Sequence, residues 1–129
     1  MYSPLFWIEW LDRLDRVLTS ARQDVAVLKR AVSPRSLEAI ERSKRQLAAL
    51  INDLRLLDRD VVSTAATPNA ADNLQKALDA TVVQLGSLAE IPALSAPGVL
   101  DRMLAASDSA LRDSCYEAAM LLAPSRRRA

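Results

Sequence analysis

Residues 4–32 read PLFWIEWLDRLDRVLTSARQDVAVLKRAV, and their apolar side chains recur at alternating steps of four and three residues. The positions that follow this rule are Trp7, Leu11, Leu14, Leu18, Ala21, Val25, Leu28 and Val32. Such a seam lies along one side of an α-helix, because each turn takes 3.6 residues. Phe6, Trp10 and Val17 lie along one flank of the seam and widen it. A widened stripe favours a helix in a bundle over a two-stranded coiled coil.

Prolines mark where this helix and its neighbours begin and end. Serine or threonine followed by proline, which is typical of a helix N-cap and first helical position, occurs at Ser3-Pro4, Ser33-Pro34 and Thr67-Pro68. Pro92 and Pro124 should each end a helix, since proline lacks the N–H that a continuing helix needs. The sequence predicts an all-α, antiparallel, up-down-up-down four-helix bundle with helices at about 4–32, 34–63, 69–91 and 98–123. We expect one domain at 1–124 and a short basic tail at 125–129.

The joint at Ser33-Pro34 allows two structures. Proline disfavours helical geometry at the preceding residue, so the first two predicted helices form either a tight antiparallel hairpin or one long kinked helix. We favour the hairpin. It would place Asp58, at an apolar position of the second helix, level with Trp7 and Trp10. A buried carboxylate needs a partner, so we expect an indole N–H or an arginine to hold it.

Composition removes several kinds of chemistry. The 129 residues include two glycines, one cysteine (Cys115) and no histidine, and the formal net charge is +1. Without histidine the chain cannot serve as a phospho-histidine relay, a Glu-x-x-His di-iron bundle or a His-ligated haem bundle. Two glycines make a nucleotide-cradling loop implausible. We therefore predict a protein that is not an enzyme and has no catalytic residues, cofactor or metal.

The chain also lacks the usual signals for membranes and export. No apolar run reaches the roughly 20 residues of a membrane span, and the N-terminus lacks the basic and apolar regions of a secretory signal. The lone cysteine fits a reducing compartment. We therefore expect a cytoplasmic protein with no membrane span.

Four of the five aromatic residues lie within the first ten positions. They either plug one end of the bundle or form a contact site, since Trp and Tyr dominate binding hot spots. The uncharged stretch at 82–89 is a second candidate surface, because it is either buried on several sides or meets another chain. The predicted partner-binding residues are Phe6, Trp7, Ile8, Trp10, Val82 and Leu85.

These features favour a non-catalytic helical protein–protein interaction module: an adaptor, a small chaperone or a subunit of a larger assembly. We expect it to bind a protein partner, itself, or both, as a homo-oligomer. The alternative is a helical subunit of a nucleoprotein complex that contacts RNA or DNA backbone through Arg42, Arg45, Arg126, Arg127 and Arg128. Five arginines follow an acid four residues earlier, namely Arg13, Arg16, Arg42, Arg45 and Arg112, and this pairing within the helices argues against a free basic stripe. Serine and alanine at 107, 114 and 118 indicate either close helix approach or an internal cavity.

Overall fold

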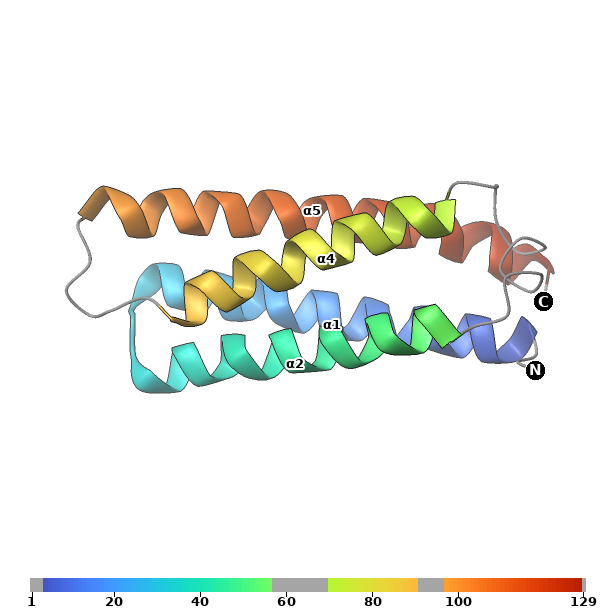
Figure 1. The fold of residues 1–129 in the computed structure, drawn as a ribbon, viewed down its shortest axis with the longest axis horizontal. Coiled ribbons are helices and arrows are strands. Elements are labelled where there is room, and N and C mark those ends of the chain that lie inside the picture. The colour runs from blue at the N-terminus through green and yellow to red at the C-terminus, as the bar shows by residue number, and fades with distance from the viewer. Residues whose placement is uncertain (1–3, 57–69, 91–96, 129) are drawn as a thin grey trace.

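The computed structural model describes the backbone of residues 4–56, 70–90 and 97–128, and the side chains of 7–56, 72–90 and 98–121. These residues form four helices: α1 (Pro4–Arg30), α2 (Pro34–Leu56), α4 (Ala70–Ala89) and α5 (Pro97–Arg128). Each helix runs opposite to the one before it, as the colours of Figure 1 show. The main packing contacts join α1 to α2, α2 to α4, α4 to α5, and α5 back to α1. The predicted all-α four-helix bundle is confirmed, with the helices at four corners in chain order.

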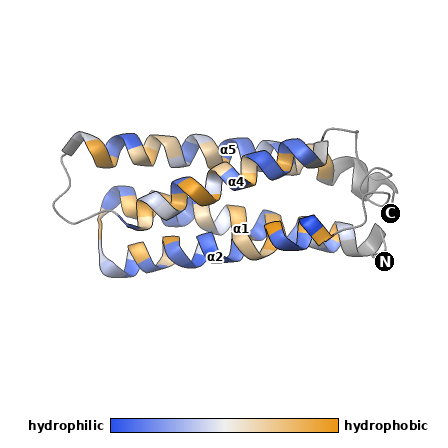
Figure 2. Ribbon diagram, in the orientation of Figure 1, coloured by the Kyte–Doolittle hydropathy of each residue, from blue (hydrophilic) through white to orange (hydrophobic). Residues whose placement is uncertain are grey.

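The apolar seam of α1 forms a central part of the hydrophobic core. Trp7, Leu11, Leu14, Leu18, Ala21, Val25 and Leu28 are all buried. Val32 is 44% exposed, because α1 ends at Arg30 and this last seam position falls in the turn. The other helices complete the core with the following buried side chains: Ile40, Leu47, Leu50, Ile51, Leu54, Leu74, Leu78, Leu85, Leu88, Leu104, Leu111 and Leu121. Hydrophilic and hydrophobic residues alternate along every helix, as Figure 2 shows and as amphipathic helices require.

The turn between α1 and α2 confirms the hairpin and excludes one kinked helix. Residues 31–33 are not helical. Ser33 Oγ accepts the backbone N–H of Ser36 at 3.1 Å, and Ser36 Oγ accepts the backbone N–H of Ser33 at 2.9 Å. This reciprocal pair is a capping box in which serine takes the place usually held by Glu or Gln. It satisfies backbone donors at the start of α2 that would otherwise lack partners.

Other helix ends depart from the predictions or lie outside the described residues. The predicted C-terminal part of the second helix (57–63), which includes Asp58, is not among the described residues. The start predicted at Thr67-Pro68 also lies outside them. The indole of Trp10 donates to the backbone oxygen of Leu50 at 3.1 Å. This indole N–H is therefore bound to α2, and the expectation that an indole or an arginine holds Asp58 stays a prediction.

The predicted stop at Pro124 is wrong, because α5 runs on to Arg128. The basic segment predicted as a tail is thus helical in its backbone as far as that residue. Proline's fixed φ of about −65° is itself helical, and its missing N–H removes one hydrogen bond. Only four residues of α5 follow Pro124, so the interruption falls at the end of a long helix.

Candidate interaction surface on α4 and α5

The structure places two of the predicted contact residues in the core. Trp7 and Trp10 are both 0% exposed, and their rings stack with centroids 5.4 Å apart and planes 7° from parallel. Ile8 is half-buried, and the side chain of Phe6 lies outside the described residues. A partner cannot reach the two indoles in this conformation. Their predicted contact role is corrected: Trp7 occupies the seam itself, and Trp10 occupies the flank that faces α2.

The uncharged stretch of α4 is also mostly internal. Leu85 is fully buried, and Val82 is half-buried and packs against the core. The stretch lacks charge because α4 occupies a corner and contacts both α2 and α5. Gly86 faces α2, where a Cβ would lie 3.5 Å from Cε of Lys44. In this stretch the large apolar side chain that faces solvent is that of Val83, next to Val82, and it is 63% exposed.

Two arginines of the alternative prediction, Arg42 and Arg45, are exposed, and the charge of Arg45 is partly compensated. Arg42 and Arg45 lie on the outer side of α2. Nε of Arg45 lies 3.4 Å from a carboxylate oxygen of Glu41, which also lies 3.6 Å from Nζ of Lys44. The side chains of Arg126, Arg127 and Arg128 lie outside the described residues.

A groove between α4 and α5 carries large apolar side chains that the structure leaves in solvent. Its volume is about 350 Å³. The residues that line it are Asn73, Lys76, Ala77, Ala80, Asp113, Tyr116 and Glu117. Tyr116 is 63% exposed, and Met120, one turn further along α5, is 55% exposed. We call this surface, together with Met120, the α4–α5 groove.

Sequence reasoning missed Tyr116 and Met120, although the sequence contains a signal for them. The core positions of the last helix include Leu111, Ala118 and Leu121. A tyrosine and a methionine spaced i,i+4 outside that arc lie together on the outer side of the helix. The spacing of apolar residues along α5 therefore already places these two large side chains outside the core.

Hydrogen bonds fix the two walls of the groove to each other. The hydroxyls of Thr81 and Ser114 form a hydrogen bond, with Oγ1 and Oγ 2.7 Å apart, in which either can be the donor. Thr81 Oγ1 also lies 3.0 Å from the backbone oxygen of Ala110, to which it can donate. Both hydroxyl residues are fully buried. A threonine side chain reaches a backbone carbonyl of the next helix only where the helices approach closely. The small residues of α5 are thus explained by close helix packing.

The charge of the groove is mainly acidic. Asp113 and Glu117 stand on the α5 side, and Lys76 on the α4 side offsets one of them. Neither carboxylate forms a salt bridge with a residue that the structure describes. The groove therefore offers a small apolar floor with unpaired negative charge at its rim.

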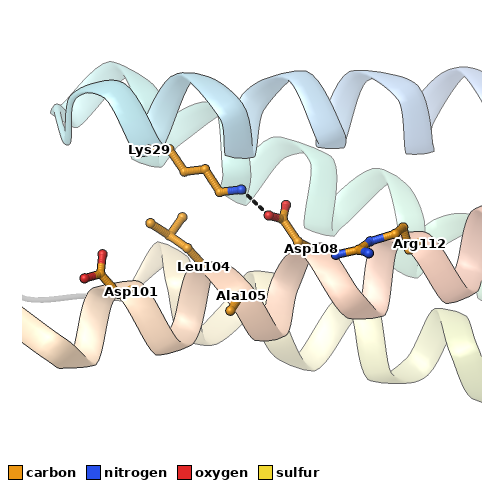
Figure 3. A pocket seen from close by; sticks show the side chains of 6 residues that line it. All are labelled: Lys29, Asp101, Leu104, Ala105, Asp108 and Arg112. Carbon is orange, nitrogen blue, oxygen red and sulfur yellow. Dashed lines mark hydrogen bonds and ion pairs between the residues drawn. The ribbon is translucent and has the colours of Figure 1, made fainter.

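A second groove lies between α1 and α5 and has a different character. Lys29 reaches from α1 to the carboxylate of Asp108 on α5, and the two form an ion pair (Figure 3). The groove is also about 350 Å³ and is lined by Lys29, Asp101, Leu104, Ala105, Asp108 and Arg112. Two cations and two anions balance each other there, and the ion pair spans the opening. This arrangement selects no particular ligand charge.

Cys115 lies half-buried beside Arg22, between α5 and α1. Burial raises the pKa of its thiol above the ordinary value, and the charge and hydrogen bond of Arg22 oppose that rise in part. The thiolate is the nucleophilic form, so a raised pKa suppresses reactivity at neutral pH. Within the part of the chain that the structure describes, no three Cys, Asp or Glu side chains are grouped to hold a metal.

Two further findings concern membranes and relatives. Among the described residues, no helix is both long enough and apolar enough to cross a membrane. No protein-family model matches the chain, and neither the curated proteins nor the solved structures contain a significant match.

Proposed function

We propose that this chain is a non-catalytic helical interaction module whose α4–α5 groove receives an apolar side chain of a protein partner. The observation that carries the proposal is the exposure of Tyr116 and Met120 beside a floor of two alanines. Large apolar side chains exposed next to each other mark interaction sites more often than isolated ones do. Tyrosine is also enriched among residues that carry binding energy.

The shape of the groove limits what it can take. Ala77 and Ala80, spaced i,i+3, leave a depression on α4 that the ring of Tyr116 borders. A volume of about 350 Å³ lies at the lower end of small-molecule pockets, and it suits one or two side chains of a partner. Helix-in-groove recognition works in this way, with a few apolar anchors seated between two helices.

The acidic rim favours a partner that brings cations near its apolar anchor. Unpaired Asp113 and Glu117 would steer such a partner and fix its register more than they would raise affinity. The same acids would repel nucleic-acid phosphates. On α2, Arg45 shares Glu41 with Lys44, so part of the positive charge there is compensated and the nucleoprotein alternative has less support.

Site-specific photo-cross-linking tests the proposal. A photoreactive phenylalanine would replace Tyr116, which keeps an aromatic ring at the groove, and the matched control would replace exposed Glu38 on α2. We expect irradiation of cells that make the chain to yield a discrete protein adduct from position 116 and none from position 38. Adducts to nucleic acid, equal adducts at both positions, or none at all would each refute the proposed function.

A further inference from the structure

The α1–α2 half of the bundle is basic, and the part of the α4–α5 half up to residue 121 is acidic. Residues 4–56, which contain α1 and α2, hold ten Lys or Arg against seven Asp or Glu. Residues 70–121, which contain α4 and most of α5, hold three Lys or Arg against seven Asp or Glu. The formal charges of these two ranges are therefore +3 and −4, and the three arginines at the end of α5, Arg126 to Arg128, bring the second total to −1. Because the helices occupy four corners in chain order, these charges lie on opposite layers of the bundle (Figure 1).

The basic half has an exposed apolar end of its own, where α1 turns into α2. Val27 is 51% exposed and Val32 is 44% exposed. Arg30 and Arg35 are exposed beside them, and neither forms a salt bridge with any residue that the structure describes. We call these four residues the basic hairpin end.

We propose that the occupant of the α4–α5 groove is the basic hairpin end of a second copy of this chain. The inference rests on the proposed function, to which it adds the identity of the partner. Each surface supplies what the other lacks. The groove has an apolar depression and two unpaired acids, and the hairpin end has two exposed valines and two unpaired arginines.

A valine suits the groove in size, since the floor is made of alanines and the volume admits one or two small branched side chains. With a valine seated there, Arg30 and Arg35 come near Asp113 and Glu117. Arginine pairs with carboxylates through two parallel hydrogen bonds, which adds orientation to attraction. The capping box holds the turn rigid before contact, so little ordering entropy is lost on binding.

This contact joins different surfaces of the two copies. The groove lies between α4 and α5, and the hairpin end lies at one tip of the other layer, where α1 meets α2 (Figure 1). One copy that binds through its groove still presents a free hairpin end, and the next copy presents a free groove. Contacts of this kind build rings or open chains instead of closed two-fold dimers.

Sedimentation velocity of the purified chain over a concentration series tests the proposal. We expect the average sedimentation coefficient to rise past that of a dimer as concentration approaches about 1 mM, and to fall again when salt screens the charges. A monomer at every concentration, or a plateau at the dimer, overturns the proposal. If the chain is monomeric while photo-cross-linking traps a different protein at position 116, the proposed function stands and this inference fails.

Charge reversal identifies the two surfaces. One double variant reverses the charge of the groove (Asp113→Arg with Glu117→Arg), and the other reverses the charge of the hairpin end (Arg30→Glu with Arg35→Glu). Each should weaken association at least about tenfold. A mixture of the two variants should associate to within about threefold of the wild type, because the reversed charges again attract. The matched control, Arg13→Glu with Arg16→Glu, makes the same charge change near the other end of α1 and should weaken association by less than about threefold. Failure of the mixture to recover, or an equal loss in the control, overturns the assignment.

Discussion

Replacing Trp10 with phenylalanine tests whether the N-terminal aromatic cluster is core or contact surface. In the structure Trp10 is 0% exposed, stacks on Trp7 and donates its indole N–H to the backbone oxygen of Leu50. Phenylalanine keeps an aromatic ring at this position but removes the donor and part of the volume. The substitution therefore isolates what the larger ring contributes to the packing of α1 against α2.

Two effects add to the expected loss. The hydrogen bond contributes about 1 kcal/mol, and its loss leaves no acceptor stranded, because a helical carbonyl keeps its own bond within the helix. The cavity left by the smaller ring costs at least about 1 kcal/mol more. We expect Trp10→Phe to lower the free energy of unfolding by about 2–3 kcal/mol. This is a large share of the 5–15 kcal/mol typical of a domain.

Urea unfolding followed by far-ultraviolet circular dichroism measures this loss as a lower midpoint at unchanged slope. The matched control is Tyr116→Phe, which also converts a polar aromatic residue to phenylalanine but at a position 63% exposed. The control should change stability by no more than about 0.5 kcal/mol. The burial argument is refuted if Trp10→Phe costs less than about 0.5 kcal/mol, or if the two substitutions cost the same.

Three further changes test other parts of the fold. Ser33→Ala removes the capping hydroxyl of α2 and should cost about 1 kcal/mol in urea unfolding, and no loss would contradict the observed cap. Gly86→Ala should stabilise the chain by about 0.5–1 kcal/mol, because the new Cβ meets the stem of Lys44 at ordinary contact distance, and a lower melting temperature would show a clash instead. The thiol of Cys115 should react with iodoacetamide more slowly at pH 8 in the folded chain than in urea. Because folding raises the pKa of this thiol, the free energy of unfolding should also decline as pH rises from the pKa of the unfolded thiol to the higher pKa of the folded one. Equal reaction rates in the folded and unfolded chain would exclude the raised pKa.

The order and direction of the helices could be predicted because the sequence encodes them locally. The four-three spacing of α1 determines which side is buried, and its positions from Trp7 to Leu28 are all in the core. Serine followed by proline correctly marks the start of α1 and α2. The two hydrogen bonds between Ser33 and Ser36 also depend on local sequence alone, since both partners lie within one turn.

Helix ends were harder to predict, because they depend on a balance between local strain and packing. Val32 continues the seam by spacing, yet α1 ends at Arg30 so that the chain can reverse before Pro34. Pro124 should stop a helix by its chemistry, yet α5 continues past it. In the first case the turn geometry outweighs the pattern. In the second, the loss of one hydrogen bond near a helix end is too small to end it.

The candidate surface was harder still, because absence of charge is an ambiguous signal. The stretch from Val82 contains no charged residue, which fits either a contact surface or burial on two sides. The corner position of α4 decides for burial of Leu85 and exposure of Val83. That decision depends on which helices are neighbours, and a single helix pattern does not contain this information.

The exposure of Tyr116 follows from how α4 and α5 pack. Where two helices approach closely enough for Thr81 to reach the backbone of Ala110, the side chains between them must be small. The interior positions of α5 accordingly hold Ser107, Ser114 and Ala118, all buried. Tyr116 and Met120 lie outside these interior positions and project outward. The close packing that joins α4 to α5 is thus also the reason why this side of the bundle offers apolar groups to a partner, while α1 keeps its tryptophans in the core.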